Sequence, residues 1–361
     1  MDKATMRLPG WTTVGLLCLT QTARTQDLHK EREGHGVPIV LLPGSPGSVR
    51  DFRIPAPGSR SLFDLLKESH TVLAVDPPGH GESKCEAGNL DESVAAIGTA
   101  LQSEKLTQRP FVLGYSWGAV LASAYATKYP ERVAGLVLVS PVVYADPTLL
   151  ETTESIPAIN EIPFVGGMLA GLSDALMPGL SLLEVEDTGE DASKTRMVRI
   201  PYHVDKELNK GWVQGSFKAS GSVAIDLRTF ASIASDTISA RLKKAFAPDE
   251  VPPAYMAYAC EVRSSPERVR AMSRDATAIV NGDLASHAEA LTALKVPCLI
   301  IYGEKDDYVR PKMHALRLAT VMSSQPVMRP VPAAGHALVV SHPQAVHARI
   351  VEWLASATKE K

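Results

Sequence analysis

Cysteine is scarce in this chain of 361 residues, and no long apolar run is present. The four cysteines, Cys18, Cys85, Cys260 and Cys298, fit no zinc-binding spacing. Four cysteines in a chain of this length do not indicate a disulfide framework. No stretch has the length needed to cross a bilayer. We therefore expect neither a small cross-linked domain nor an integral membrane protein.

A basic stripe is also missing from the sequence. Lys and Arg total 37 against 40 Asp and Glu, which gives a formal net charge of −3, and the cations are scattered. Because binding to nucleic acid relies on clustered positive charge, we expect no nucleic-acid partner. The 45% apolar content is sufficient for a large α/β core.

Residues 111–120 have the sequence F-V-L-G-Y-S-W-G-A-V, which contains a G-x-S-x-G pattern. The apolar residues before the pattern predict a buried strand, and the small residues after it predict a helix. A sharp turn between strand and helix can present a serine at the sheet edge, provided that its neighbours are small. Ser116, between Gly114 and Gly118, is therefore the candidate nucleophile; the alternative is an ordinary Gly-Ser turn.

Apolar segments alternate with helical patterns on both sides of this motif. Continuous apolar strands of this kind are typical of a parallel sheet that is covered on both faces. The expected strands are 37–42, 71–75, 111–113, 133–140, 296–303 and 327–331, and the expected helices are 61–69, 91–105, 311–322 and 343–357.

The alternation stops between about residues 146 and 294. Helical patterns occur there at 223–246 and 265–279, and 184–194 is predicted to be an acidic loop. We therefore expect a core formed by 24–145 and 290–361, with a mostly helical cap at 146–289. Residues 1–23 are predicted to be a leader or an edge strand. We expect a cytoplasmic protein, and a weak N-terminal apolar run leaves export as the alternative.

A serine nucleophile needs a base, and the base needs a third group that orients it. His336 is the preferred base because Gly335-His336-Ala337 follows the last expected strand. Among the acids, Asp306 is preferred over Asp307, with Asp146 as an outside candidate. The histidines that rank lower are His80, His203, His287, His314 and His342.

Acyl-transfer chemistry also needs two backbone N–H groups that stabilise the developing oxyanion. Trp117, which follows the serine, would supply one of them. The other would come from the loop after the strand 37–42. Pro43 and Pro46 have no N–H, so Ser45 is the expected donor and Gly44 the reserve.

Taken together, these segments resemble the α/β-hydrolase fold superfamily. The residues that carry the resemblance are 42–48, 75–83, 114–118, 303–306 and 335–336, and it extends over about 24–145 and 290–358. The resemblance implies an α/β fold with a mostly parallel central sheet, helices on both faces and an inserted cap. It also implies a Ser116–His336–Asp306 triad, and the sequence gives no sign of a metal or an organic cofactor.

The expected activity is hydrolysis of a carboxylic ester or lactone through an acyl-enzyme. The apolar segment 162–183 suggests a small-molecule substrate with a largely apolar acyl group; the alternative is ordinary packing within the cap. Peptidase or acyltransferase chemistry on the same triad is the alternative, and a non-catalytic binding protein is a third possibility. The loop P-G-S-P-G at 43–47 departs from the H-G-G-P-G of proline iminopeptidases, although 116–118 is shared with them. A serine at 116 disfavours dehalogenase and epoxide hydrolase chemistry, because those enzymes use aspartate there.

Overall fold

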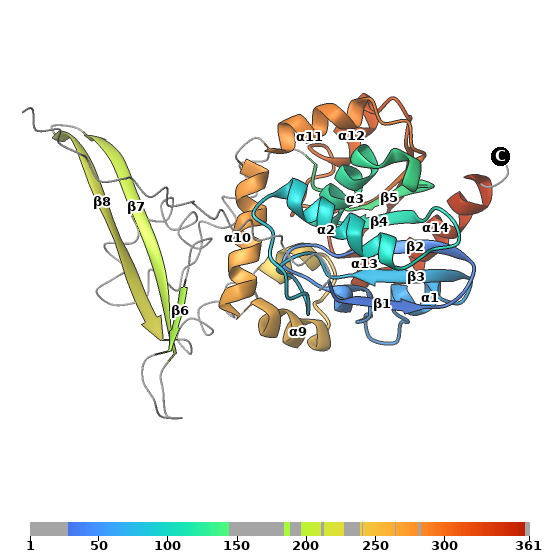
Figure 1. Cartoon of the computed structure of the whole chain (residues 1–361), viewed down its shortest axis with the longest axis horizontal. Coiled ribbons are helices and arrows are strands. Elements are labelled where there is room, and N and C mark those ends of the chain that lie inside the picture. Colours follow the sequence, from blue (N-terminus) through green and yellow to red (C-terminus); the bar gives the residue numbers. More distant parts are fainter. Residues whose placement is uncertain are drawn as a thin grey trace, which may run out of the picture.

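A seven-stranded sheet forms the centre of the molecule in the computed structural model (Figure 1). The structure describes residues 28–143, 184–187, 196–210, 213–226, 239, 241–263, 265–280 and 283–357. The strand order is β1-β3-β2-β4-β5-β9-β10; β1 is antiparallel to β3, and the other neighbours are parallel. The strands are β1 (Lys30–Glu33), β2 (Val37–Leu42), β3 (His70–Val75), β4 (Phe111–Tyr115), β5 (Gly135–Val139), β9 (Cys298–Gly303) and β10 (Val327–Val331).

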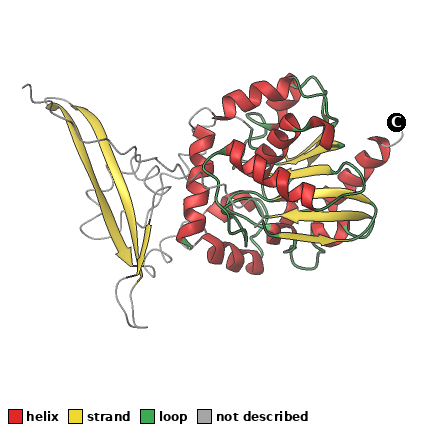
Figure 2. Cartoon of the chain, in the orientation of Figure 1, coloured by secondary structure: helices red, strands yellow, loops and turns green. Residues whose placement is uncertain are grey.

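Helices cover both faces of this sheet, as the sequence predicts (Figure 2). Val40 and Leu42 of β2 join the apolar cluster that includes α2, α3, α11 and α12, whereas Ile39 and Leu41 join the cluster that includes α1, α13 and α14. Successive residues of a strand point to opposite faces, so a strand covered on both faces must be apolar throughout. These helices are α1 (Leu62–Leu66), α2 (Leu90–Ser103), α3 (Trp117–Lys128), α11 (Asp283–Thr292), α12 (Ala315–Val321), α13 (Leu338–Ser341) and α14 (Pro343–Ala357).

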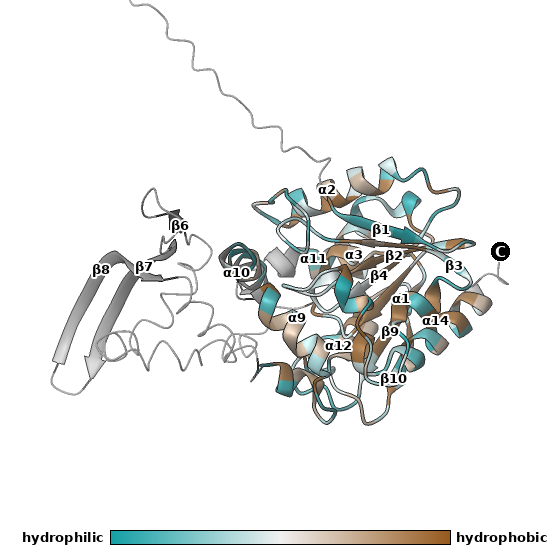
Figure 3. Ribbon diagram, turned by 90° about the horizontal axis from the view of Figure 1, so that it is seen from below, coloured by the Kyte–Doolittle hydropathy of each residue, from teal (hydrophilic) through white to brown (hydrophobic). Residues whose placement is uncertain are grey.

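The edge strand β1 was not predicted from the sequence. Its residues, K-E-R-E, are polar, and Figure 3 shows it as a hydrophilic strand beside the apolar strands of the sheet. Backbone pairing with β3 defines it, from Lys30 opposite Val75 to Glu33 opposite Val72. An edge strand faces water on one side, so it needs no apolar run, and its charges discourage pairing with another chain.

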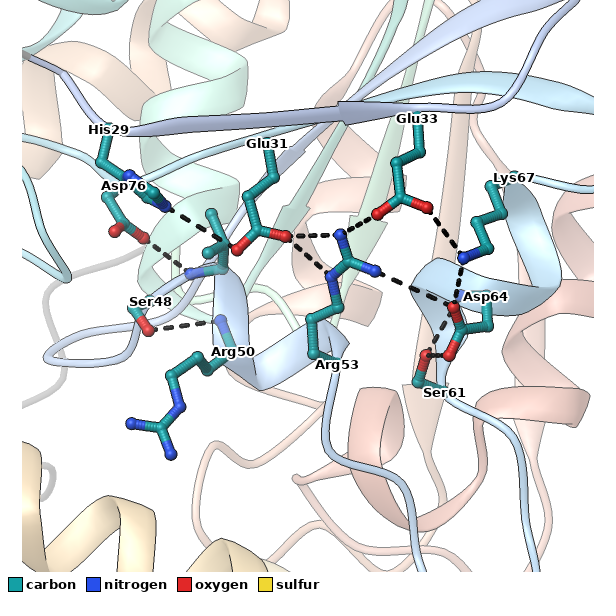
Figure 4. A network of polar contacts seen from close by, with 11 residues as sticks. His29, Glu31, Glu33, Ser48, Arg50, Arg53, Ser61, Asp64, Lys67 and Asp76 are labelled. Atoms are coloured by element: carbon teal, nitrogen blue, oxygen red, sulfur yellow. Dashed lines mark hydrogen bonds and ion pairs between the residues drawn. The ribbon is translucent and has the colours of Figure 1, made fainter.

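Ion pairs hold β1 against the segments that follow β2 (Figure 4). The Arg53 Nε donates to Glu31 at 2.8 Å, and Arg53 also pairs with Glu33. The Lys67 Nζ lies 2.8 Å from Glu33 and 2.9 Å from Asp64. The hydrogen bond from Lys67 holds the pKa of the Glu33 carboxyl below its ordinary value. The network therefore connects the charged edge strand to α1.

The chain between β5 and β9 forms helices and a second sheet. α9 (Pro253–Arg263) and α10 (Pro266–Val280) agree with the helical expectation, and residues 241–246 are helical. The separate antiparallel sheet has the order β6-β7-β8 and consists of β6 (Glu184–Asp187), β7 (Arg196–Lys210) and β8 (Val213–Asp226).

This second sheet corrects two local predictions. Residues 184–187 are a strand rather than part of an acidic loop, and 223–226 belong to β8 rather than to a helix. Long antiparallel pairing between β7 and β8 satisfies the backbone without a continuous apolar run, so the polar sequence did not predict it. Residues 1–23 and 162–183 lie outside the described residues. Among the described helices, none combines the length and apolarity that a bilayer span requires.

Candidate active site

Ser116 occupies the turn between β4 and α3, in the middle of the seven-stranded sheet. Its φ of 53° and ψ of −116° place a non-glycine residue in a sparsely populated backbone region. Such a conformation costs about 1–3 kcal/mol and persists only when the surroundings enforce it. A Cβ at Gly114 would lie 2.1 Å from the Gly118 carbonyl oxygen, and a Cβ at Gly118 would lie 2.2 Å from the Leu42 carbonyl oxygen. The two glycines therefore allow strand and helix to approach closely and hold the turn.

His336 and Asp306 come to this serine from the ends of β10 and β9. The His336 Nε2 lies 3.0 Å from the Ser116 Oγ, and the His336 Nδ1 lies 2.8 Å from the Asp306 Oδ2. His336 and Asp306 are each 3% exposed. Because parallel strands end at one sheet edge, residues separated by 220 positions in sequence can meet there.

The choice between the two adjacent acids follows from their contacts. Asp306 is buried, and its second oxygen accepts hydrogen bonds from the backbone N–H groups of Tyr308 at 3.0 Å and Val309 at 2.7 Å. Asp307 is exposed. The carboxylate of Asp306 is therefore fixed on one side by the backbone and presented to His336 on the other. Asp146, the outside candidate, lies outside the described residues.

The backbone of His336 is held by a contact that no sequence pattern indicates. Its N–H donates to the Ala245 carbonyl at 2.8 Å, and its carbonyl accepts from the Ser140 Oγ at 2.9 Å. The rings of Tyr115 and Tyr308 lie 5.5 and 5.2 Å from the imidazole, centroid to centroid. Ala245 belongs to the helical segment 241–246, so the insertion between β5 and β9 helps to position the imidazole.

The loop after β2 passes beside the serine, as the oxyanion-loop prediction requires. A Cβ at Gly44 would lie 3.2 Å from the Ser116 Cβ. Among the described residues, the N–H groups of Ser45 and Trp117 donate to no protein acceptor. Trp117 is the first residue of α3, where helix geometry leaves the N–H without an internal partner.

The other histidines are separate from the serine, and four of them have contacts of their own. The Nδ1 of His314 accepts from the Val143 N–H, His287 contacts Ser123, His342 faces Asp249, and His80 contacts Ser45. His203 lies in β7.

Asp76, an acidic side chain near the oxyanion loop, has a structural role. It accepts from the N–H groups of Val49 at 2.6 Å and Glu82 at 2.8 Å. Burial raises the pKa of its carboxyl above the ordinary value. These bonds join the loop after β2 to the turn after β3.

A family profile, described as the alpha/beta hydrolase family, matches residues 39–349. The chain belongs to the alpha/beta hydrolase family. The match includes Ser116, Asp306 and His336 and continues through the insertion between β5 and β9.

Curated relatives of this hydrolase match part of the chain. An abhydrolase domain-containing protein, lid-1 of Caenorhabditis elegans, is 31% identical over 150 residues, which is 40% of this chain and 39% of the relative. A proline iminopeptidase of Neisseria meningitidis is 30% identical over 123 residues, 33% of this chain and 37% of that enzyme. The matched stretches are thus well under half the length of each relative.

Solved structures extend the similarity of this hydrolase over most of the chain. An alpha/beta hydrolase fold protein from Burkholderia ambifaria superposes with a TM-score of 0.60 and 18% sequence identity, covering 90% of this chain and 93% of that one. At this identity the likeness concerns the fold.

Proposed function

We propose that this alpha/beta hydrolase cleaves a carboxylic ester or lactone through an acyl-enzyme on Ser116. The observation that carries the proposal is the 3.0 Å contact between the Ser116 Oγ and the His336 Nε2, with Asp306 on the opposite ring nitrogen. A serine hydroxyl becomes an effective nucleophile only when a base accepts its proton, and a carboxylate keeps the base in the required tautomer.

In the proposed mechanism, the Ser116 Oγ attacks the carbonyl carbon while its proton passes to the His336 Nε2. The carbonyl oxygen becomes an oxyanion that the N–H groups of Trp117 and Ser45 would stabilise. The tetrahedral intermediate collapses, and the leaving alkoxide takes the proton from His336. Water then attacks the acyl carbon with His336 as base, and the carboxylic acid leaves as Ser116 regains its proton.

We also propose that the core of this mechanism is formed by 24–145 and 290–361, with 146–289 as the cap. The contact between the Ala245 carbonyl and the His336 N–H supports a cap that reaches the site. The proposed substrate is a small molecule with a largely apolar acyl group. The apolar segment 162–183, on which that proposal rests, lies outside the described residues.

Peptide hydrolysis is the second candidate function. The similarity to a proline iminopeptidase favours it, because the same triad could accept an amine leaving group. The loop 43–47 lacks the H-G-G-P-G pattern of those enzymes, so the ester proposal comes first. Acyl transfer would differ only in the acceptor that resolves the acyl-enzyme.

Steady-state hydrolysis of p-nitrophenyl esters, from acetate to dodecanoate, tests the proposal. Ser116→Ala should reduce kcat to background. Asp306→Asn should lower kcat by about 10⁴-fold, because the amide would no longer hold the His336 ring in the tautomer with its proton on Nδ1. Asp307→Asn is the matched control and should retain full activity, since Asp307 is exposed.

Two results would contradict this assignment. Full activity in Ser116→Ala would exclude the serine as nucleophile. Equal losses in the Asp306 and Asp307 variants would exclude a specific role for Asp306. If the wild type cleaves prolyl p-nitroanilide and no ester, the peptidase candidate replaces the esterase.

A further inference from the structure

His80 links the loop after β2 to a helix of the insertion. It is 2% exposed and lies in the turn after β3. Its Nδ1 lies 3.0 Å from the Pro78 carbonyl oxygen, so this nitrogen carries a proton and donates. Its Nε2 lies 3.0 Å from the Asp275 Oδ2 on α10 and 3.3 Å from the Ser45 Oγ. One buried imidazole therefore contacts both the expected oxyanion donor and α10.

The charges around the imidazole favour its protonated form. Burial alone would lower the pKa of His80, but the carboxylate of Asp275, with a smaller contribution from Asp76, raises it above the ordinary value. Of the other charged groups on this face, Arg270 and Arg274 of α10 pair with Glu86 at 3.6 and 3.2 Å. Apart from the ion-pair contact with His80, the buried Asp275 Oδ2 has no hydrogen-bond partner among the described residues. Asp275 is thus oriented toward the imidazole, while the neighbouring arginines have a different partner.

One short loop connects Ser45, which His80 contacts, to the nucleophile Ser116. Ser45 is adjacent to Gly44, and a Cβ at Gly44 would lie 3.2 Å from the Ser116 Cβ. Pro78 holds the Nδ1 of the ring and Asp275 holds the Nε2, so the orientation of the imidazole is fixed. The Nε2 is thereby kept next to the Ser45 Oγ. Removing Asp275 would release one end of the ring.

We propose that His80 and Asp275 are positioning residues that hold the loop 43–48 in its oxyanion-binding conformation, so that the packing of α10 onto the core is coupled to the chemistry at Ser116. This inference rests on the proposed function. It assigns a role to a histidine that ranked low as a candidate base. It also gives α10 a part in positioning the loop 43–48.

The decisive variant is Asp275→Leu, which removes the charge at similar volume. With p-nitrophenyl butyrate, kcat should fall by about 10- to 100-fold, the range expected when a catalytic group is misplaced, and KM should change little. Because burial then acts on His80 without its partner, the alkaline limb of the kcat profile should move to lower pH. A protein that had only lost stability could show a lower apparent kcat at unchanged KM, because less of it is folded, but it would not show the shift of this limb.

Glu86→Gln is the matched control. It breaks the ion pairs of Arg270 and Arg274 with the core on the same helix and leaves His80 untouched. Its kcat and pH profile should match the wild type. A double-mutant cycle then locates the path: Ser45→Ala keeps the backbone N–H, and adding Asp275→Leu to it should cause no further loss.

An NMR measurement separates this inference from the proposed function. In protein labelled with ¹⁵N-serine and ¹⁵N-histidine, Asp275→Leu should shift the Ser45 amide resonance and lower the pKa of His80, and Glu86→Gln should change neither. If no ester is hydrolysed in a Ser116-dependent way, the proposed function fails, and an unchanged Ser45 amide in Asp275→Leu would overturn the positioning role as well. In an active enzyme, an unchanged kcat and alkaline limb in Asp275→Leu, or an equal effect of Glu86→Gln, would overturn it.

Discussion

The burial of His287 makes the stability of this hydrolase depend on pH. His287 lies on α11, is 8% exposed, and has its Nε2 2.8 Å from the Ser123 Oγ of α3. Burial lowers the pKa of His287 to about 4, whereas an unfolded histidine titrates near about 6.5. Between about pH 6.5 and pH 4, His287 is therefore protonated in the unfolded chain and neutral in the folded chain. His287 therefore leaves the free energy of unfolding unchanged above about pH 6.5 and lowers it as the pH falls toward 4.

The magnitude follows from the two pKa values. Linkage gives a loss of about 2 kcal/mol at pH 5 and on the order of 3 kcal/mol by pH 4. Urea denaturation of wild type and His287→Leu from pH 7.5 to 4.5 measures it, because the difference between the two curves cancels every other titrating group. The Ser123 Oγ also donates to the Ala119 carbonyl at 2.6 Å, so it keeps a partner in the variant. If the two curves run parallel over this range, His287 is not a buried neutral imidazole and the reasoning fails.

Two further predictions concern packing and surface charge. Gly114→Ala should lower the free energy of unfolding by about 3 kcal/mol and abolish activity, since the new Cβ would meet the Gly118 backbone and force α3 away from β4. Gly58→Ala, where nothing lies within 4 Å and the only cost is backbone strain at a φ of 74°, should keep its activity; equal losses in both variants would contradict the packing argument. Arg53→Gln should cost about 1 kcal/mol in urea denaturation at low salt and less at 1 M NaCl, because it removes the ion pairs with Glu31 and Glu33. A loss that does not depend on salt would refute the electrostatic cause.

The buried strands could be predicted from the sequence because burial on both faces leaves a continuous apolar signal. The bounds of β2 (Val37–Leu42) match the expected range, and β3 (His70–Val75) begins one residue before the expected 71–75. The edge strand β1 and the β7–β8 pairing could not be predicted, since backbone hydrogen bonds define them without an apolar run.

In the candidate site, too, some residues could be predicted from the sequence and others could not. Ser116, His336 and Asp306 stand next to turn sequences at strand ends, so local pattern and chain order were enough to select them as candidates. The Ala245 carbonyl and the Asp275 carboxylate act on the site from the insertion. Their roles depend on tertiary contacts between residues far apart in the chain, and neither residue stands in a recognisable motif.

The hydrogen bond from the His336 N–H to the Ala245 carbonyl restricts how this protein could be re-engineered. A Cβ at Gly335 would lie 2.1 Å from the Ala247 carbonyl oxygen, so the two segments touch along their backbones. Exchanging the insertion for that of another hydrolase would remove the support of the imidazole unless the graft ended before residue 241. Any chimera therefore has to keep residues 241–247 together with the core, although they precede β9 by some fifty positions.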